Sequence, residues 1–189
     1  MAGTSLPIGP PDPQTVALQA SDLPSGLHAC PGSGSIDSYL QQIRSKDPDS
    51  YSSVKDAWDE FQRSGADAAA ITAYTEQSSA CGGVLGAGQG KSAASFVIRY
   101  KDQSSAVAAY RKGILGFPNP ASAQQTPGLT VGEATGFGPN SWVYNQTIQG
   151  RAAYIAFWEE KQFDILVFAA DLDPGDATRA ARAVDSRAR

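Results

Sequence analysis

The stretches SWVYNQTI (residues 141–148), AAYIAFWE (152–159) and FDILVFAAD (163–171) decide the fold. Each one resembles a β-strand, and only the very short connections around "QG" and "EK" separate them. Strands joined by such short connections pair antiparallel, as a meander. We therefore expect a three-stranded antiparallel sheet in the C-terminal third of the chain.

Both faces of this sheet are apolar. Because successive side chains of a strand point to opposite faces, two-residue turns assign each residue to one of them. One face carries Trp142, Tyr144, Ile155, Phe157, Leu166 and Phe168, and the other carries Tyr154, Trp158, Phe163, Ile165 and Val167. Two apolar faces both need a cover, so the sequence predicts an antiparallel sheet with helices on both sides.

The rest of the chain supplies further strands and the helices. Residues 68–78 and 92–100 alternate as strands, which brings the sheet to about five strands. Four segments have the spacing and end signals of helices. They begin after the Ser35 N-cap, after a cap at Asp49 or Ser50, after Asp102, and after Pro174 and Asp176. The predicted fold class is a single α+β domain.

Composition limits the classes of partner. The net charge of −4 and scattered Lys and Arg residues argue against nucleic-acid binding, which needs clustered positive charge. No apolar run approaches the ~20 residues of a membrane span. Residues 1–13 are rich in Pro and Gly and form an expected tether, and residues 14–189 form the domain. We expect a monomer that contacts a membrane only through an N-terminal anchor outside this sequence.

Two cysteines, Cys30 and Cys81, lie in the turn-like contexts ACPG and ACGG. They are either two buried thiols of a cytosolic protein or one disulfide. We favour the disulfide, because buried thiols are less expected in loops flanked by Gly and Pro. In the chain-entropy picture, a loop of this size adds roughly 4 kcal/mol of stability. A disulfide would place the domain in an oxidising compartment.

The glycine-rich stretch GVLGAGQGKSAASF (83–96) resembles a phosphate-binding P-loop. The motif G-x-x-x-x-G-K-[ST] needs a glycine five residues before Gly90, where this chain has Leu85. A strand rather than a helix is predicted to follow, so the helix N-terminus that binds phosphate is missing. We expect no nucleotide binding here, and only an occasional anion contact at Lys91 and Ser92.

The sequence offers little support for any other catalytic or metal-binding site. His28 is the single histidine, so any Ser–His–Asp or Cys–His scheme would need it, and it lies two residues from Cys30. No set of His, Cys, Asp or Glu residues has convincing metal spacing. The carboxylates of DLDPGD (171–176) are better explained as helix caps than as a calcium site. We therefore expect no catalytic residues, no metal and no cofactor.

A binding surface is expected on the sheet. The face with Tyr154, Trp158 and Phe163 is the less crowded, and an incompletely covered apolar face would mark a ligand or partner site. The alternative is full burial of this face under the Tyr51–Phe61 helix. In that case binding must be sought in the loops at 82–92 and 116–140.

The order of several stretches resembles a known class of protein. These stretches are ASDLPSGL, AWDEF…GADAAAITAY, SFVIRYKDQSSAVAAYRKG, TVGEATGF, AAYIAFWEEKQFDILVF and a closing ARAVDSR helix. Their order is similar in outline to secreted bacterial lipoproteins with a Mog1/PsbP-like sandwich and to kinase-linked extracellular sensor domains of actinobacteria, the PknH type. Those sensors usually carry more than one disulfide, whereas this chain can form only one.

The resemblance implies a non-enzymatic binding or sensing role in the bacterial envelope, secreted or anchored at the cell surface. The partner would be an unidentified small molecule or envelope protein. Two other classes stay open. One is a phosphate-handling or hydrolytic enzyme that uses the glycine loop at residues 86–92. The other is a structural or assembly subunit that associates through its apolar sheet faces.

Overall fold

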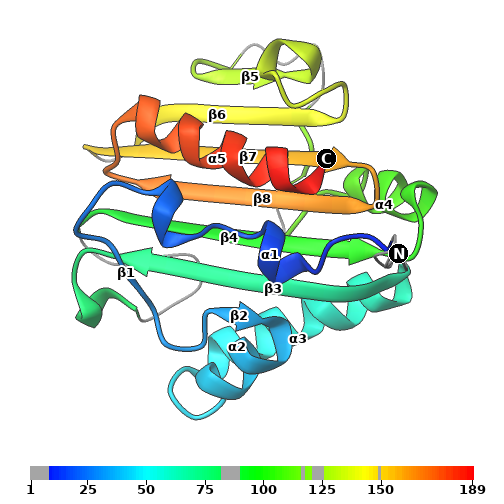
Figure 1. The fold of residues 1–189 in the computed structure, drawn as a ribbon, viewed down its shortest axis with the longest axis horizontal. Coiled ribbons are helices and arrows are strands. Elements are labelled where there is room, and N and C mark those ends of the chain that lie inside the picture. The colour runs from blue at the N-terminus through cyan, green and yellow to red at the C-terminus, as the bar shows by residue number, and fades with distance from the viewer. Residues whose placement is uncertain (1–8, 82–89, 116–117, 121–125, 149) are drawn as a thin grey trace, which may run out of the picture.

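The computed structural model describes residues 9–81, 90–115, 118–120, 126–148 and 150–189. They form one antiparallel sheet with helices on both faces (Figure 1). The expected α+β class is confirmed. The sheet has eight strands rather than about five, because three strands of only two or three residues border the five long ones.

The strands follow the order β1-β3-β4-β8-β7-β6-β5 across the sheet, and β2 also pairs with β3. They are β1 (His28–Ala29), β2 (Gly34–Ser35), β3 (Ala66–Thr75), β4 (Ser92–Tyr100), β5 (Leu129–Val131), β6 (Ser141–Ile148), β7 (Arg151–Glu160) and β8 (Phe163–Ala170). The helices are α1 (Pro13–Val16), α2 (Ile36–Ile43), α3 (Pro48–Arg63), α4 (Gln103–Tyr110) and α5 (Pro174–Ala188), with short 3-10 turns η1 (Ala20–Asp22), η2 (Ser78–Ala80) and η4 (Gly132–Thr135).

The C-terminal meander is confirmed, with β6, β7 and β8 paired in sequence. Trp142 lies opposite Phe157, and Phe157 lies opposite Leu166. These three residues belong to one core cluster, whereas Tyr154 and Trp158 belong to the cluster on the other side of the sheet. The assignment of side chains to the two faces is therefore correct.

One side of the sheet, which we call the α5 face, is covered by α5 and by residues 12–23, which we call the strap (Figure 1). The residues that α5 buries are mostly small, so the helix can lie close to the strands. They are Ala177, Ala180, Ala181, Val184, Asp185 and Ala188. The strap buries Val16, Ala17 and Leu18 almost completely. The strap comes from the N-terminal part of the described chain, and α5 comes from its C-terminal part.

The opposite side, the α3 face, is covered by α2, α3 and α4. Large side chains fill this side, and the ring of Phe61 on α3 meets Phe96 edge-on at 5.8 Å between centroids. On α4, Tyr110 stacks on Phe157 with centroids 4.9 Å apart. The Tyr51–Phe61 helix therefore lies over β3 and β4 on the face opposite Trp158. The alternative that this helix buries Trp158 is wrong about the helix, although Trp158 is fully buried.

Helix starts differ slightly from expectation. Ser35 and Asp102 cap α2 and α4 as predicted. Asp47 caps α3, two residues before Asp49 and three before Ser50, and Pro48 is the first helical residue. Asp173 caps α5 in the same way, followed by Pro174. Proline suits a first helical position because the N–H that it lacks would have no partner there.

Two short segments border β3 on its outer side. The β1 and β2 strands each pair with only two residues of β3. Between them the Ser33 hydroxyl donates to the carbonyl of Ala73 and accepts from its N–H, both at 3.1 Å. A side chain thus completes the hydrogen bonding that a strand backbone would otherwise provide.

None of the helices within the described ranges is both long and apolar enough to cross a membrane. Residues 9–12 are exposed, and Pro13 is buried as the first residue of α1.

Candidate functional site

Cys30 and Cys81 form a disulfide, as expected, with an S–S distance of 2.04 Å and Cα atoms 5.4 Å apart. The bond joins the end of β1 to the residue after η2, across 51 positions of sequence. The backbone N–H of Cys30 donates to the Ala73 carbonyl at 2.8 Å, which fixes this cysteine against β3. The disulfide therefore anchors two irregular segments on the outer strand of the sheet.

Thr75 lies beside both sulfur atoms of the disulfide. Its hydroxyl lies 3.4 Å from the Cys81 sulfur and 3.7 Å from the Cys30 sulfur, and it donates to the Gln77 carbonyl at 2.9 Å. Thr75 is 1% exposed, so this arrangement lies inside the domain. The contacts with β3 therefore hold the disulfide in a defined position on the surface of the domain core.

A groove of about 570 Å³ lies beside this disulfide, between α2 and the β1–β3 edge. The disulfide, Pro31, Ile43, Ala73 and Ala80 give it apolar surface, while His28, Gln42 and Lys46 supply polar groups. The complete lining is His28, Ala29, Cys30, Pro31, Tyr39, Gln42, Ile43, Lys46, Asp47, Ala73, Thr75, Ser78, Ala80 and Cys81. An apolar space with a few polar groups is the usual form of a small-molecule site.

Tyr39 combines a buried side chain with a hydroxyl that is available to a ligand. Its side chain is only 7% exposed, yet its hydroxyl has no hydrogen-bond partner among the described residues. Burial raises the pKa of this phenol, and the negative charge of Asp47 raises it further. The phenol therefore keeps its proton at neutral pH, and it presents a free donor to a ligand in the groove.

The charged groups of the groove have different roles. Hydrogen bonds from the side chain and the backbone of Ser50 hold the pKa of Asp47 below its usual range. Asp47 is thus an ionised N-cap of α3, occupied by its own helix. Lys46 makes no ion pair within the described part of the chain. Lys46 is therefore the cation that a ligand in this groove would meet.

The groove lacks the pairing that a hydrolase needs. Ser78 and His28 both line it, but no hydrogen bond joins them in the described structure. A nucleophile of this kind needs a base within hydrogen-bond reach. The described residues also contain no group of three or more His, Cys, Asp and Glu side chains arranged to hold a metal ion.

The prediction of an incompletely covered sheet face is wrong. Tyr154, Trp158 and Phe163 are 4%, 0% and 1% exposed, so they form no ligand or partner surface. The reason is the close approach of α5, together with Phe137, whose ring stacks on Trp158 with centroids 4.6 Å apart. The sequence showed these aromatic residues but not that a small-residue helix and the strap would close over them.

The glycine loop is described only from Gly90 onward, because residues 82–89 lie outside the described ranges. Ser92 begins β4, which pairs antiparallel with β3, so the strand predicted in place of a P-loop helix is confirmed. Ser92 is 1% exposed, so it is not the surface anion contact that we expected. Lys91 is exposed, and an anion contact there stays a prediction.

Sequence reasoning did not identify Tyr39, Gln42 and Lys46 as site residues. They lie on or just after α2, and only the folding of α2 against β3 brings them to the disulfide. The available signal was the disulfide itself, because it predicts that the ACPG and ACGG turns meet.

No protein-family profile and no curated protein matches this chain. A solved structure of the extracellular domain of PknH from Mycobacterium tuberculosis is similar to it, with 12% sequence identity and a TM-score of 0.45. The alignment covers 95% of this chain and 97% of that one.

Proposed function

We propose that this protein is an extracytoplasmic, non-enzymatic binding domain, and that its ligand occupies the groove beside the Cys30–Cys81 disulfide. The observation that carries the proposal is the free Tyr39 hydroxyl in a groove of about 570 Å³ with a disulfide in its wall. Disulfides persist in oxidising compartments, which supports a location outside the cytosol.

The groove chemistry defines the class of ligand. The disulfide, Ile43 and Ala73 suit an apolar portion of the ligand. Tyr39 and Lys46 offer a hydrogen-bond donor and a positive charge. The ligand is therefore a small amphiphile whose head group accepts hydrogen bonds or carries negative charge. Binding of such a ligand places its head near α2 and its apolar part against the disulfide.

A titration with octanoate as probe tests this site. Backbone amide shifts in two-dimensional NMR are expected to move at Tyr39, Thr75 and Cys81 and to saturate. Octanol, which has the same chain without the charge, is expected to bind more weakly. Tyr39→Phe and Lys46→Gln should each weaken octanoate binding by roughly tenfold, the worth of one charge-assisted hydrogen bond.

Tyr51→Phe is the matched control for the phenol, because Tyr51 lies on α3 and does not line the groove. Shifts confined to other regions, or affinities that Tyr39→Phe and Lys46→Gln leave unchanged, would remove the groove as the site. The location is tested separately by thiol alkylation in the native host. Labelling of Cys30 and Cys81 without reductant would contradict an oxidising compartment.

A further inference from the structure

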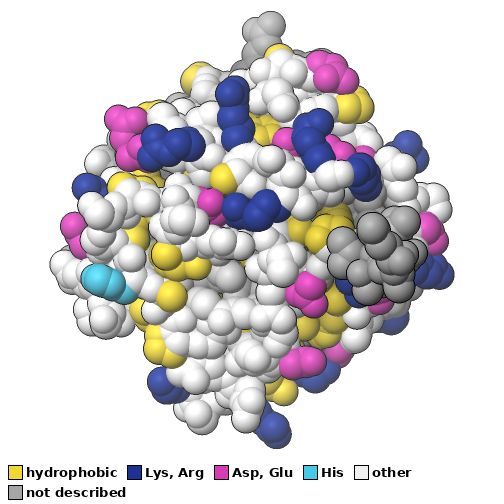
Figure 2. All heavy atoms as spheres, in the orientation of Figure 1, with side chains coloured by type: hydrophobic (Ala, Val, Ile, Leu, Met, Phe, Trp, Pro, Cys, Tyr) yellow, Lys and Arg dark blue, Asp and Glu magenta, His cyan; other side chains and the backbone are white. Residues whose placement is uncertain are grey.

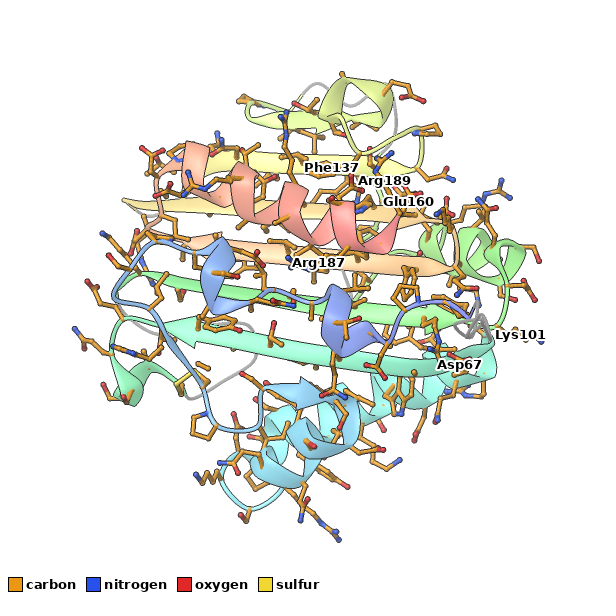
Figure 3. The ribbon with its side chains drawn as sticks, in the orientation of Figure 1. Asp67, Lys101, Phe137, Glu160, Arg187 and Arg189 are labelled. Carbon is orange, nitrogen blue, oxygen red and sulfur yellow. A yellow bond between two sulfur atoms is a disulfide. The ribbon has the colours of Figure 1, made fainter. Side chains whose placement is uncertain are left out.

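A second, smaller pocket lies on the opposite side of the sheet, between α5 and the segment formed by β5 and η4, which we call the arm. Its volume is about 160 Å³, room for about five water molecules. Figure 3 labels Phe137, one of the lining residues, between α5 and the arm. The pocket is lined by Gly128, Thr130, Ala134, Thr135, Phe137, Val143, Asn145, Tyr154 and Thr178.

The arm is held firmly against the sheet. A Cβ at Gly128 would meet the Asn145 carbonyl oxygen at 2.4 Å, so only glycine permits this approach. The Asn145 N–H donates to the Gly128 carbonyl at 2.8 Å. Around η4, the Ser141 hydroxyl of β6 contacts the carbonyl oxygens of Gly132 and Gly138 and the Thr135 hydroxyl. The walls of the pocket are therefore fixed before any ligand arrives.

The polar groups of the pocket are mostly hydroxyls and an amide. Thr130 and Asn145 make no side-chain hydrogen bonds within the described part of the chain. Burial raises the pKa of the Tyr154 phenol to about 12, although the Thr178 hydroxyl and the Arg182 charge both act to lower it. Tyr154 thus stays protonated, with Thr178 and Arg182 beside its hydroxyl.

Arg182 provides a positive charge beside the pocket: it does not line the pocket itself, but it lines a neighbouring hollow on α5 that shares Thr178 with it. One guanidinium nitrogen lies 4.0 Å from the position of a Cβ on Gly136, which places the group between α5 and the arm. The other three arginines of this C-terminal region, Arg179, Arg187 and Arg189, each pair with a carboxylate. Arg182 makes no ion pair among the described residues. Figure 2 shows Lys and Arg side chains gathered over this half of the molecule.

We propose that this pocket binds a monosaccharide that carries one negative charge, either a sugar acid or a sugar phosphate. Thr130, Asn145 and Thr178 hydrogen-bond the ring hydroxyls, and Arg182 pairs with the anionic group. The volume admits one ring rather than a chain of them. This site is separate from the disulfide groove, because it lies on the α5 face and shares none of its residues.

The test is calorimetry and NMR titration of the full chain with four probes: glucuronate, glucose 6-phosphate, glucose and inorganic phosphate. Saturable binding is expected for glucuronate or glucose 6-phosphate, and whichever binds more tightly identifies the anion. Glucose and phosphate alone should bind at least tenfold more weakly. Equal binding of phosphate would show a plain anion contact, and equal binding of glucose would show that the charge is unused; either overturns the proposal.

Arg182→Gln should weaken the charged sugar at least tenfold and leave glucose unchanged. Thr130→Val should weaken both. The control is Arg111→Gln, which removes one exposed charge at the end of α4, on the other side of the sheet. An equal effect of Arg111→Gln and Arg182→Gln, or no saturable binding of either charged sugar, overturns the proposal. Octanoate binding in the other groove should persist in Arg182→Gln, so the two sites can fail independently.

Discussion

The two faces of the sheet are both sealed by helices, but they bury their polar groups differently. On the α5 face the buried groups of the sheet strands are hydroxyls that hold the strap. The Leu18 N–H donates to Ser95, and the Tyr74 hydroxyl donates to the Leu18 carbonyl, both at 3.0 Å. On the α3 face the buried groups include carboxyls. Asp164 is 2% exposed and lies directly opposite Glu159 in the β7–β8 pairing.

The carboxyls of the α3 face have unequal partners. Glu159 accepts from Gln103 at 3.3 Å and from Asn140 at 2.9 Å, whereas one oxygen of Asp164 has no hydrogen-bond partner among the described residues. Burial raises the pKa of Asp164 well above its usual range; the Tyr100 hydroxyl opposes this, and Glu159 adds to it. The two faces therefore differ in what their buried polar groups do. On the α5 face they hold the strap in place, whereas on the α3 face a carboxyl group, Asp164, is buried with a raised pKa.

The largest expected effect tests the apolar seal of the α5 face. Trp158→Ala should lower the free energy of unfolding by about 3–5 kcal/mol, because it removes a fully buried ring stacked on Phe137. Urea unfolding measures this change. Trp158→Phe is the matched variant, since it keeps a ring and removes the unpartnered indole N–H, and it should cost clearly less. A loss below 1 kcal/mol for the alanine variant would contradict the sealed face.

The next effect tests the attachment of the strap. Arg187 on α5 contacts both carboxylate oxygens of Asp22, at 3.0 and 2.6 Å, and donates to the carbonyls of Val16 and Ala17 (Figure 3). Arg187→Ala should lower the unfolding free energy by about 2 kcal/mol, because charge-assisted hydrogen bonds are lost while Asp22 stays mostly buried. Hydrogen exchange should quicken first at Leu18. Exchange that quickens only on α5 would show that the strap is held by burial alone.

The α3 face should give the pH dependence. The folded-state pKa of Asp164 is raised, so the stability it contributes is full below about pH 4, its unfolded pKa, and is lost as pH rises toward the folded pKa. Asp164→Asn removes this loss. Its stability relative to wild type should therefore increase by up to about 1.4 kcal/mol per pH unit above pH 4, until the folded pKa is passed.

Urea unfolding at pH 4, 5 and 6 measures the slope. Asp56→Asn, at an exposed position on α3, is the control and should shift the curve by the same small amount at every pH. A constant difference between Asp164→Asn and wild type over this range would show that Asp164 is ionised when buried.

The smallest expected effect concerns a partly exposed ion pair between β3 and β4. Arg99 on β4 and Asp67 on β3 pair at 2.8 Å, with side chains 21% and 48% exposed. Asp67→Asn should change the unfolding free energy by less than about 1 kcal/mol, because solvent screens exposed pairs. Measured beside Arg187→Ala, it separates the value of charge from the value of the strap contacts. A loss equal to that of Arg187→Ala would mean that burial of the strap adds nothing.

Much of the fold could be predicted from local patterns. The alternation in residues 141–171 gave the meander and its faces, and the Ser35 and Asp102 caps gave two helix starts. The disulfide followed from the turn contexts of Cys30 and Cys81. These features depend on neighbours in sequence or on a single pairing, so one sequence is enough to find them.

The covers of the sheet and the pockets could not be predicted in this way. The strap lies against α5 through Arg187 and Asp22, which are 165 positions apart. Tyr39 lines the groove beside the disulfide because α2 packs on β3, and Arg182 lies beside the arm because the arm approaches β6 at Gly128. Such contacts arise from tertiary packing between segments whose local patterns say nothing about each other.

The outer strands of the sheet have a consequence for self-association. An open strand edge can pair with another molecule and start aggregation. Here β3 is bordered by β1 and β2, with the Ser33 hydroxyl occupying the backbone groups of Ala73 between them, and β5 occupies part of the β6 edge. Each border is too short to act as a good template itself. Ser33→Ala would leave the Ala73 N–H of β3 without this partner, while the Cys30 N–H still donates to the Ala73 carbonyl. Slow growth of β-rich aggregates in that variant would show that this hydroxyl protects the sheet edge.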